Sequence, residues 1–234
     1  MNAAYIACKS PSSPSNPGDP SLLIDEAAAF WIGDSQDTGS STQGHLLYAL
    51  TEFVGEKYED IPAGSQSTIN TRVIDLFNQA KTHITMTKSC TSSPTSHMKM
   101  RSILEELTPL MAAPLLRGLF YYLSIRDTVK VRMYAVSVLP LFSTCSKSTY
   151  QELKSELIDN GGIDVDKDYI FSLIKELYDC IGVSCEMVGY MPRNNYTKCE
   201  HSATHDEVVG FSYAGDHDSI VEVRIVTVQV IEKK

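Results

Sequence analysis

The sequence has little positive charge and no long apolar run. It holds 20 Lys and Arg residues against 29 Asp and Glu, which gives a formal net charge of -9 at pH 7. Proteins that bind nucleic acids or anionic membranes need a basic surface to release counterions from phosphates, and this composition offers none. No apolar run approaches the roughly 20 residues of a transmembrane helix. We therefore expect no nucleic-acid partner and no membrane span.

The motifs of common enzyme classes are also missing. The chain has no G-x-S-x-G nucleophile elbow, no glycine-rich phosphate loop and no H-E-x-x-H zinc motif. Its Ser and His residues stand in no recognisable nucleophile context. We predict a protein without enzymatic activity; an enzyme would need catalytic groups that only the fold brings together.

Six cysteines are present, and most of them lie in the C-terminal half of the chain. The spacing from Cys180 to Cys185 is too long for a redox C-x-x-C motif, and no second pair has zinc-ribbon spacing. An even, clustered set indicates disulfides and an oxidising compartment, so the predicted location is secreted, periplasmic or cell-surface. The alternative is six buried free thiols in a reduced compartment.

The secretory route has two further consequences. Residues 1–10 lack the basic and apolar regions of a signal peptide, so we expect the signal to have been removed from this chain. The sequon at Asn195 predicts N-glycosylation in a polar loop.

The length of 234 residues fits one folded domain with two flanking segments. Residues 1–19, rich in Pro and Ser, predict a mobile arm. Residues 20–218 form the predicted helical domain, and residues 219–234 a β-branched tail. The run from Ile220 to Ile231 favours a strand, with a terminal helix or an extended segment clipped onto the bundle as the alternatives.

Apolar residues recur at helical spacing through most of the domain. The first helix is predicted to begin at Pro20 behind an Asp19 cap and to end at Gly33. The other expected helical segments are 44–58, 67–85, the apolar region 98–142 with a fresh start at Asp127-Thr128, 148–158 and 165–181. Prolines 109, 114 and 140 predict kinks or breaks in that apolar region. The predicted fold is mainly α, a disulfide-stapled bundle of about seven helices with an irregular C-terminal region.

Six short segments occur together in a recognisable order. They are 22–33 (LLIDEAAAFWIG), 46–50 (LLYAL), Ile69-Asn70 with Phe77, Ala113-Pro114-Leu115 with Gly118 and Tyr122, 138–141 (VLPL) with Cys145, and 178–185 (YDCIGVSC). Taken together they resemble the algal Fe-assimilating and low-iron-inducible periplasmic proteins and the phytotransferrins. The set covers most of residues 20–218.

The resemblance implies a secreted or cell-surface helical module, often present in tandem copies, that captures ferric iron with carbonate as a synergistic anion. This chain resembles one copy and departs from the pattern in two places. A cysteine pair expected near residues 56–60 is absent, and Ser143-Thr144 stands where a histidine is expected before Cys145. Both departures bear on iron binding more than on the fold.

Ferric iron is a hard cation that prefers phenolate, carboxylate and imidazole ligands. The predicted ligands are Asp25, His45, Tyr48 and Tyr122, the last because it matches the family's tyrosine. His45 and Tyr48 stand three apart and would share one face of a helix. The structural alternatives are a helix-dipole role for Asp25 and an aromatic seam around Tyr48.

A bound carbonate would need a cationic cradle. The available guanidinium groups are Arg72, Arg101 and Arg117, and we predict Arg117 as the anion-binding residue, with a surface ion pair as the alternative. A second metal-like spacing, His201 with His205, falls in loop-type sequence, where a solvated histidine cluster is the favoured interpretation.

The order of the expected helices suggests three disulfides, although the sequence leaves the connectivity open. The proposed pairs are Cys8–Cys90, Cys145–Cys180 and Cys185–Cys199. Two functions follow from the whole sequence. The first is a ferric-iron-binding, iron-uptake module that is non-enzymatic and carbonate-assisted. The alternative is a structural or protein-interaction module that kept the fold, lost the metal site and docks onto a larger assembly.

Overall fold

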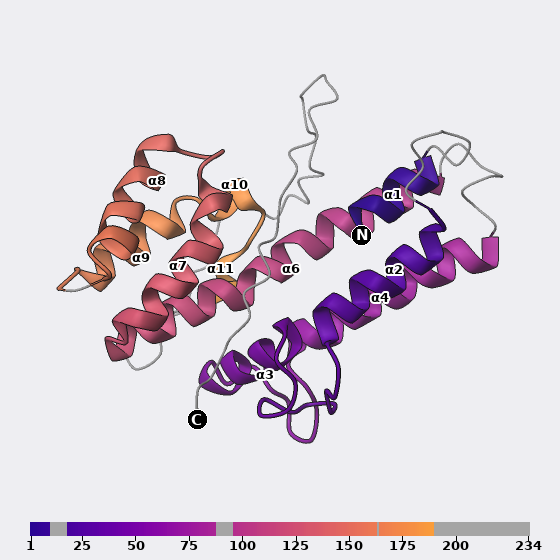
Figure 1. Cartoon of the computed structure of the whole chain (residues 1–234), viewed down its shortest axis with the longest axis horizontal. Helices are drawn as coiled ribbons and strands as arrows, with labels where there is room; N and C mark the ends of the chain where they lie inside the picture. Colours follow the sequence, from indigo (N-terminus) through magenta and orange to yellow (C-terminus); the bar gives the residue numbers. More distant parts are fainter. Residues whose placement is uncertain (10–17, 88–95, 163, 190–234) are drawn as a thin grey trace, which may run out of the picture.

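The computed structural model describes residues 1–9, 18–87, 96–162 and 164–189, and every regular element within these ranges is a helix (Figure 1). The elements are α1 (Asn2–Lys9), α2 (Pro20–Ile32), α3 (Leu47–Lys57), α4 (Thr68–Thr87), α6 (Ser96–Ile125), α7 (Thr128–Phe142), α8 (Lys147–Lys154), a π-helical turn (Ser155–Asp159), α9 (Lys167–Lys175), α10 (Tyr178–Ile181) and α11 (Cys185–Val188). The predicted mainly α bundle is confirmed. Within the described ranges, no helix has the length and hydropathy needed to cross a membrane.

Helix α6 is the central element of the bundle. It packs against α1, α3 and α4 on one side and against α7, α9 and α11 on the other (Figure 1). Its buried residues, among them Leu107, Leu116 and Phe120, lie on several faces, as expected for a helix surrounded by partners. The core therefore runs along α6, and segments distant in sequence meet on its surface.

The prolines do not break their helices. Pro109 and Pro114 lie inside α6, and Pro140 lies inside the last turn of α7. A proline removes one backbone hydrogen bond and crowds the preceding turn, a cost of roughly 3 kcal/mol. Burial of α6 on several sides offsets that cost. The prediction allowed kinks or breaks, and neither α6 nor α7 is broken at a proline.

A close approach joins α6 and α7. Gly118 has no side chain where Tyr134 packs, and a Cβ at this position would lie 2.4 Å from Tyr134 Cε1. Packing, rather than backbone angles, therefore requires glycine at position 118. The close packing of α6 on α7 also fixes the position of the preceding residue, Arg117.

The predicted helix ends are largely confirmed. Asp19 caps α2 through the Ser21 N–H, Gly33 ends it, and Asp127 caps α7. Gly161 and Gly162 have φ of 66° and 69°, the left-handed conformation expected of a helix stop. The predicted helix over 165–181 is instead two helices, α9 and α10, separated at Glu176-Leu177.

The prediction of a mobile arm over residues 1–19 is wrong for its first part. Residues 2–9 form α1, which packs against α2 and α6 and buries Ala4, Ala7 and Cys8. The small alanine side chains let this short helix lie close to its partners. The Pro and Ser residues that follow it in the sequence led to the prediction of an arm instead of a helix. Residues 10–17 lie outside the described residues.

One disulfide is fully defined and matches the prediction. Cys145, after the end of α7, is bonded to Cys180 in α10 with a Cα–Cα distance of 5.9 Å. Cys8 and Cys185 are disulfide-bonded as well. Their predicted partners, Cys90 and Cys199, lie outside the described residues, as do Asn195, the His201–His205 spacing and the 219–234 tail.

Candidate functional site

The predicted ligands Asp25 and His45 lie at the surface. Asp25, on the exposed face of α2, forms an ion pair with Lys81 of α4. His45 is exposed and precedes the first residue of α3. Because His45 is not helical, it does not share a helix face with Tyr48, and that prediction is wrong. The helix begins three residues later than the predicted start at residue 44, since the chain enters it through an extended Leu46.

The predicted tyrosines Tyr48 and Tyr122 are both buried. The Tyr48 hydroxyl donates to Gln66 Oε1 at 2.6 Å and accepts from the Gly39 N–H at 3.0 Å, so it ties two loops together. Burial raises the pKa of Tyr48.

Tyr122 belongs to an aromatic cluster. Its ring stacks on Tyr134 at 5.3 Å between centroids, and its hydroxyl accepts from Lys130 Nζ at 3.3 Å. Asp25, Tyr48 and Tyr122 thus have separate hydrogen-bond partners and share none. In the described part of the chain, no group of three or more His, Cys, Asp or Glu residues is arranged to hold a metal ion.

Arg117, the predicted anion-binding residue, is held by an ion pair, a hydrogen bond and a contact with an aromatic ring. It is 4% exposed. Its Nη1 donates to Asp60 Oδ2 at 2.6 Å and its Nε donates to the Met187 carbonyl at 2.9 Å. Its guanidinium carbon lies 5.2 Å from the centroid of the Tyr58 ring. The ion pair is therefore buried, unlike the surface pair that the sequence left as an alternative.

Two residues at the end of α3 face this guanidinium. Tyr58 ends the helix and its hydroxyl donates to the Arg117 carbonyl at 3.1 Å. Asp60 follows, and its other oxygen, Oδ1, accepts from the Thr68 hydroxyl at 2.5 Å. The side chain of Asp60 is 18% exposed, so this carboxylate has a limited path to solvent.

Tyr178, the first residue of α10, is linked to this group by an electrostatic interaction with Tyr58. It is 4% exposed, and its hydroxyl is buried without a hydrogen-bond partner among the described residues. An orphaned buried hydroxyl costs about 1–3 kcal/mol. The Cys145–Cys180 disulfide holds α10 in place two residues further on. We call Tyr58, Asp60, Arg117 and Tyr178 the tyrosine–arginine cluster.

Burial sets the protonation state of the two phenols. It raises the pKa of Tyr58 and of Tyr178 well above the usual tyrosine range. The Arg117 charge opposes the rise in the pKa of Tyr58, whereas Tyr178 adds to it. Both are neutral near pH 7, so the cluster at rest holds one carboxylate paired with one guanidinium.

Helix α11 closes over one side of this cluster. Gly189, the residue after α11, has φ of 76°, and a Cβ there would lie 2.9 Å from Tyr58 Cδ1. Only glycine combines this backbone angle with contact to the tyrosine ring. The carbonyl of Met187 in α11 provides the bond to Arg117. The cluster therefore draws on α3, α6, α10 and α11.

Another buried carboxylate has a structural explanation. Glu52 is fully buried and accepts from the Ser67 N–H and from the Asn70 side-chain amide at 2.6 Å. These donors stand at the start of α4, where a negative charge complements the helix dipole. The Asn70 oxygen in turn accepts from Trp31 Nε1 at 2.9 Å. Glu52 thus stabilises the junction of α2, α3 and α4.

Sequence reasoning found Arg117 but not its companions. In the sequence, residues 56–60 stand out only for an absent cysteine pair, and Tyr178 only as part of the segment 178–185 that carries the family resemblance. No spacing rule links Tyr58 with Arg117, because they meet only where α3 packs on α6. The one local sequence signal for this cluster was an aromatic residue, Tyr58, two positions before a carboxylate, Asp60, at the end of a predicted helix.

No family model, curated protein or solved structure matches the chain. The chemistry of the tyrosine–arginine cluster therefore carries the functional assignment.

Proposed function

We propose that the protein captures ferric iron at the tyrosine–arginine cluster, as a binding module without turnover. The observation that carries the proposal is the Tyr178 hydroxyl, which is buried, has no hydrogen-bond partner among the described residues and interacts electrostatically with Tyr58. Orphaned buried polar atoms call for a physical reason, and an unsatisfied ligand position is one of them. The site replaces the predicted set of Asp25, His45, Tyr48 and Tyr122.

The donor set suits a hard trivalent cation. Tyr58 and Tyr178 would supply phenolate oxygens and Asp60 a carboxylate oxygen, which together carry three negative charges. Each Asp60 oxygen already accepts one hydrogen bond, and a carboxylate oxygen has a second lone pair for a metal. The raised pKa values mean that iron binding must displace two phenolic protons, which the cation's own charge favours.

Arg117 would hold a planar anion such as carbonate beside the metal. The hydrogen bonds to Asp60 and Met187 use two of its five N–H groups, so donors remain for an oxyanion. Acidification would return protons to the phenolates and the anion and so release the iron. Capture at neutral pH and release in acid is the resulting cycle.

The test compares two buried tyrosines. Ferric iron and bicarbonate added to the purified protein should give a visible tyrosinate-to-iron charge-transfer band. Tyr178→Phe should weaken iron binding by at least about 10-fold, because a ligand oxygen is lost. Tyr134→Phe is the matched control: Tyr134 is also buried but stacks on Tyr122 outside the cluster, and its removal should leave the band unchanged.

Two outcomes of this titration would contradict the proposal. One is a wild-type protein that shows neither an absorption band nor calorimetric heat. The other is equal loss of binding in both tyrosine variants, which would indicate a general effect on the core.

A further inference from the structure

Helix α2 presents an exposed apolar row with a negative charge at its middle. Leu22 and Phe30 are 60% and 71% exposed. They stand eight residues apart on one face, and the exposed Glu26 lies midway between them. The neighbouring Asp25 is paired with Lys81, and the amino group of Met1 lies near Glu26. We call Leu22, Glu26 and Phe30 the acidic row.

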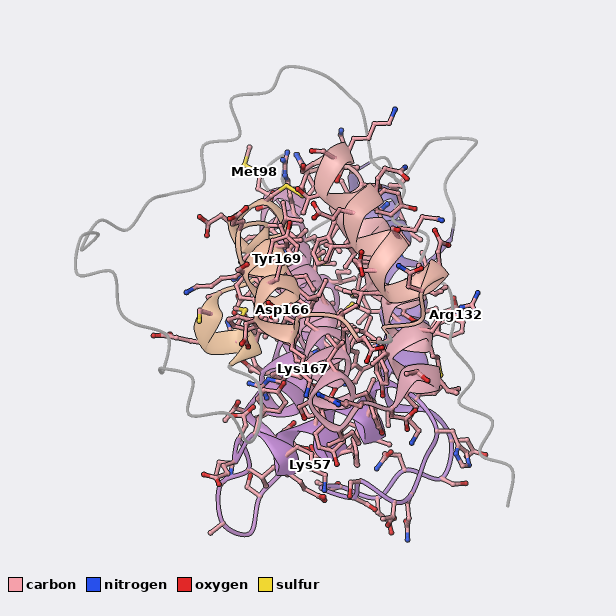
Figure 2. The ribbon with its side chains drawn as sticks, turned by 90° about the vertical axis from the view of Figure 1, so that its left-hand side faces the viewer. Lys57, Met98, Arg132, Asp166, Lys167 and Tyr169 are labelled. Atoms are coloured by element: carbon pink, nitrogen blue, oxygen red, sulfur yellow. A yellow bond between two sulfur atoms is a disulfide. The ribbon has the colours of Figure 1, made fainter. Side chains whose placement is uncertain are left out.

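Helix α7 presents a similar row with a positive charge. Val129 and Val136 are 78% and 50% exposed, and Pro140 continues their line. Arg132 is exposed on the same side, and Figure 2 shows it at the outer surface of the molecule. We call Val129, Arg132 and Val136 the basic row.

The two rows match in length and in charge. At 1.5 Å per residue, the acidic row spans roughly 12 Å and the basic row roughly 10 Å. Each has an apolar residue at both ends and one charge near its centre, of opposite sign. Opposite charges that face each other across a contact favour this pairing of surfaces over others. Helices with such faces pack by placing apolar residues together and pairing the charges.

One molecule cannot join its own two rows, because α2 and α7 lie on opposite sides of α6 (Figure 1). We propose that the acidic row of one molecule docks on the basic row of a second copy of this chain. Such a contact uses different surfaces on the two partners, so it is head-to-tail and leaves one row free at each end. Assembly should therefore grow with concentration rather than stop at a symmetric dimer.

Two single substitutions test this contact. Phe30→Asp disables the acidic row and leaves the basic row intact, while Val136→Asp does the reverse. Sedimentation from micromolar to millimolar protein should show wild type gaining mass and each variant remaining monomeric, with unchanged circular dichroism. An equimolar mixture of the two variants should form dimers that stop there, through the one intact pair of rows.

The proposal is wrong if wild type stays monomeric over that range, or if Val136→Asp assembles as wild type does. The second result would indicate a symmetric contact between two acidic rows. Charge reversal supplies an independent check: Glu26→Arg and Arg132→Glu should each assemble weakly alone, and their mixture should assemble as wild type does. Failure of the mixture to recover would also overturn the proposal.

Discussion

Arg117→Ala is expected to lower the free energy of unfolding by about 3 kcal/mol, because it leaves a largely buried Asp60 carboxylate without its cation. The substitution also removes the hydrogen bond to the Met187 carbonyl and the contact with the Tyr58 ring. The segment after α3 and helix α11, which Arg117 joins to α6, would thereby lose these contacts. Urea denaturation followed by circular dichroism measures the change.

Two further variants test whether the loss of stability comes from the geometry and the burial of the Arg117–Asp60 ion pair. Arg117→Lys keeps the charge but cannot donate to Asp60 and Met187 in the same fork geometry, so its stability should fall between wild type and alanine. Arg72→Ala is the control at an exposed pair, where Arg72 contacts Asp75 and Glu106 and is 41% exposed; the expected loss is about 0–1 kcal/mol. Equal losses at Arg72 and Arg117 would show that burial of the Asp60 pair has no energetic consequence.

Trp31→Ala is expected to cost about 3–5 kcal/mol, the largest effect of any single truncation considered. Trp31 is 1% exposed and donates to Asn70, whose amide also bonds Glu52 and the Tyr48 carbonyl. Removing the indole creates a cavity between α2 and α4 and leaves the Asn70 Oδ1 without its hydrogen-bond donor. The melting temperature should fall by roughly 10 °C.

The neighbouring residue provides the control for Trp31. Phe30 is 71% exposed, so Phe30→Ala should change stability by no more than about 0.5 kcal/mol when measured at low protein concentration. Trp31→Phe separates volume from hydrogen bonding, since it fills much of the cavity but leaves Asn70 unsatisfied; its loss should be about 1–3 kcal/mol. If Trp31→Ala and Phe30→Ala had similar effects, the assignment of α2's buried face would be wrong.

Helix ends were the most predictable part of this fold. Asp19-Pro20, Asp127-Thr128 and Gly161-Gly162 act through local backbone chemistry, so their sequence signals survive in the structure. The continuity of α6 through Pro109 was not predictable, because the compensation comes from partners on several sides of the helix. Helix α1 was missed for a related reason: its stability comes from packing on α2 and α6 rather than from its own length.

The candidate site was less predictable than the fold. Arg117 was predicted because a planar guanidinium suits an oxyanion, and the structure shows it buried in an ion pair with Asp60. The predicted pairing of His45 with Tyr48 on one helix face failed because the helix was predicted to begin three residues too early, at residue 44 instead of Leu47. Tyr178 could be recognised only from its burial and its missing hydrogen bond, both properties of the packed chain. The contacts between Tyr58 and Arg117 have no counterpart in any sequence period.

Anomalous diffraction at the iron absorption edge, on crystals grown with ferric iron and bicarbonate, tests the central claim most directly. The tyrosine–arginine cluster predicts one iron peak within bonding distance of the Tyr58 and Tyr178 oxygens and of Asp60, with an anion at Arg117. A peak at Asp25, Tyr48 or Tyr122, or no peak in crystals of the folded protein, would contradict it.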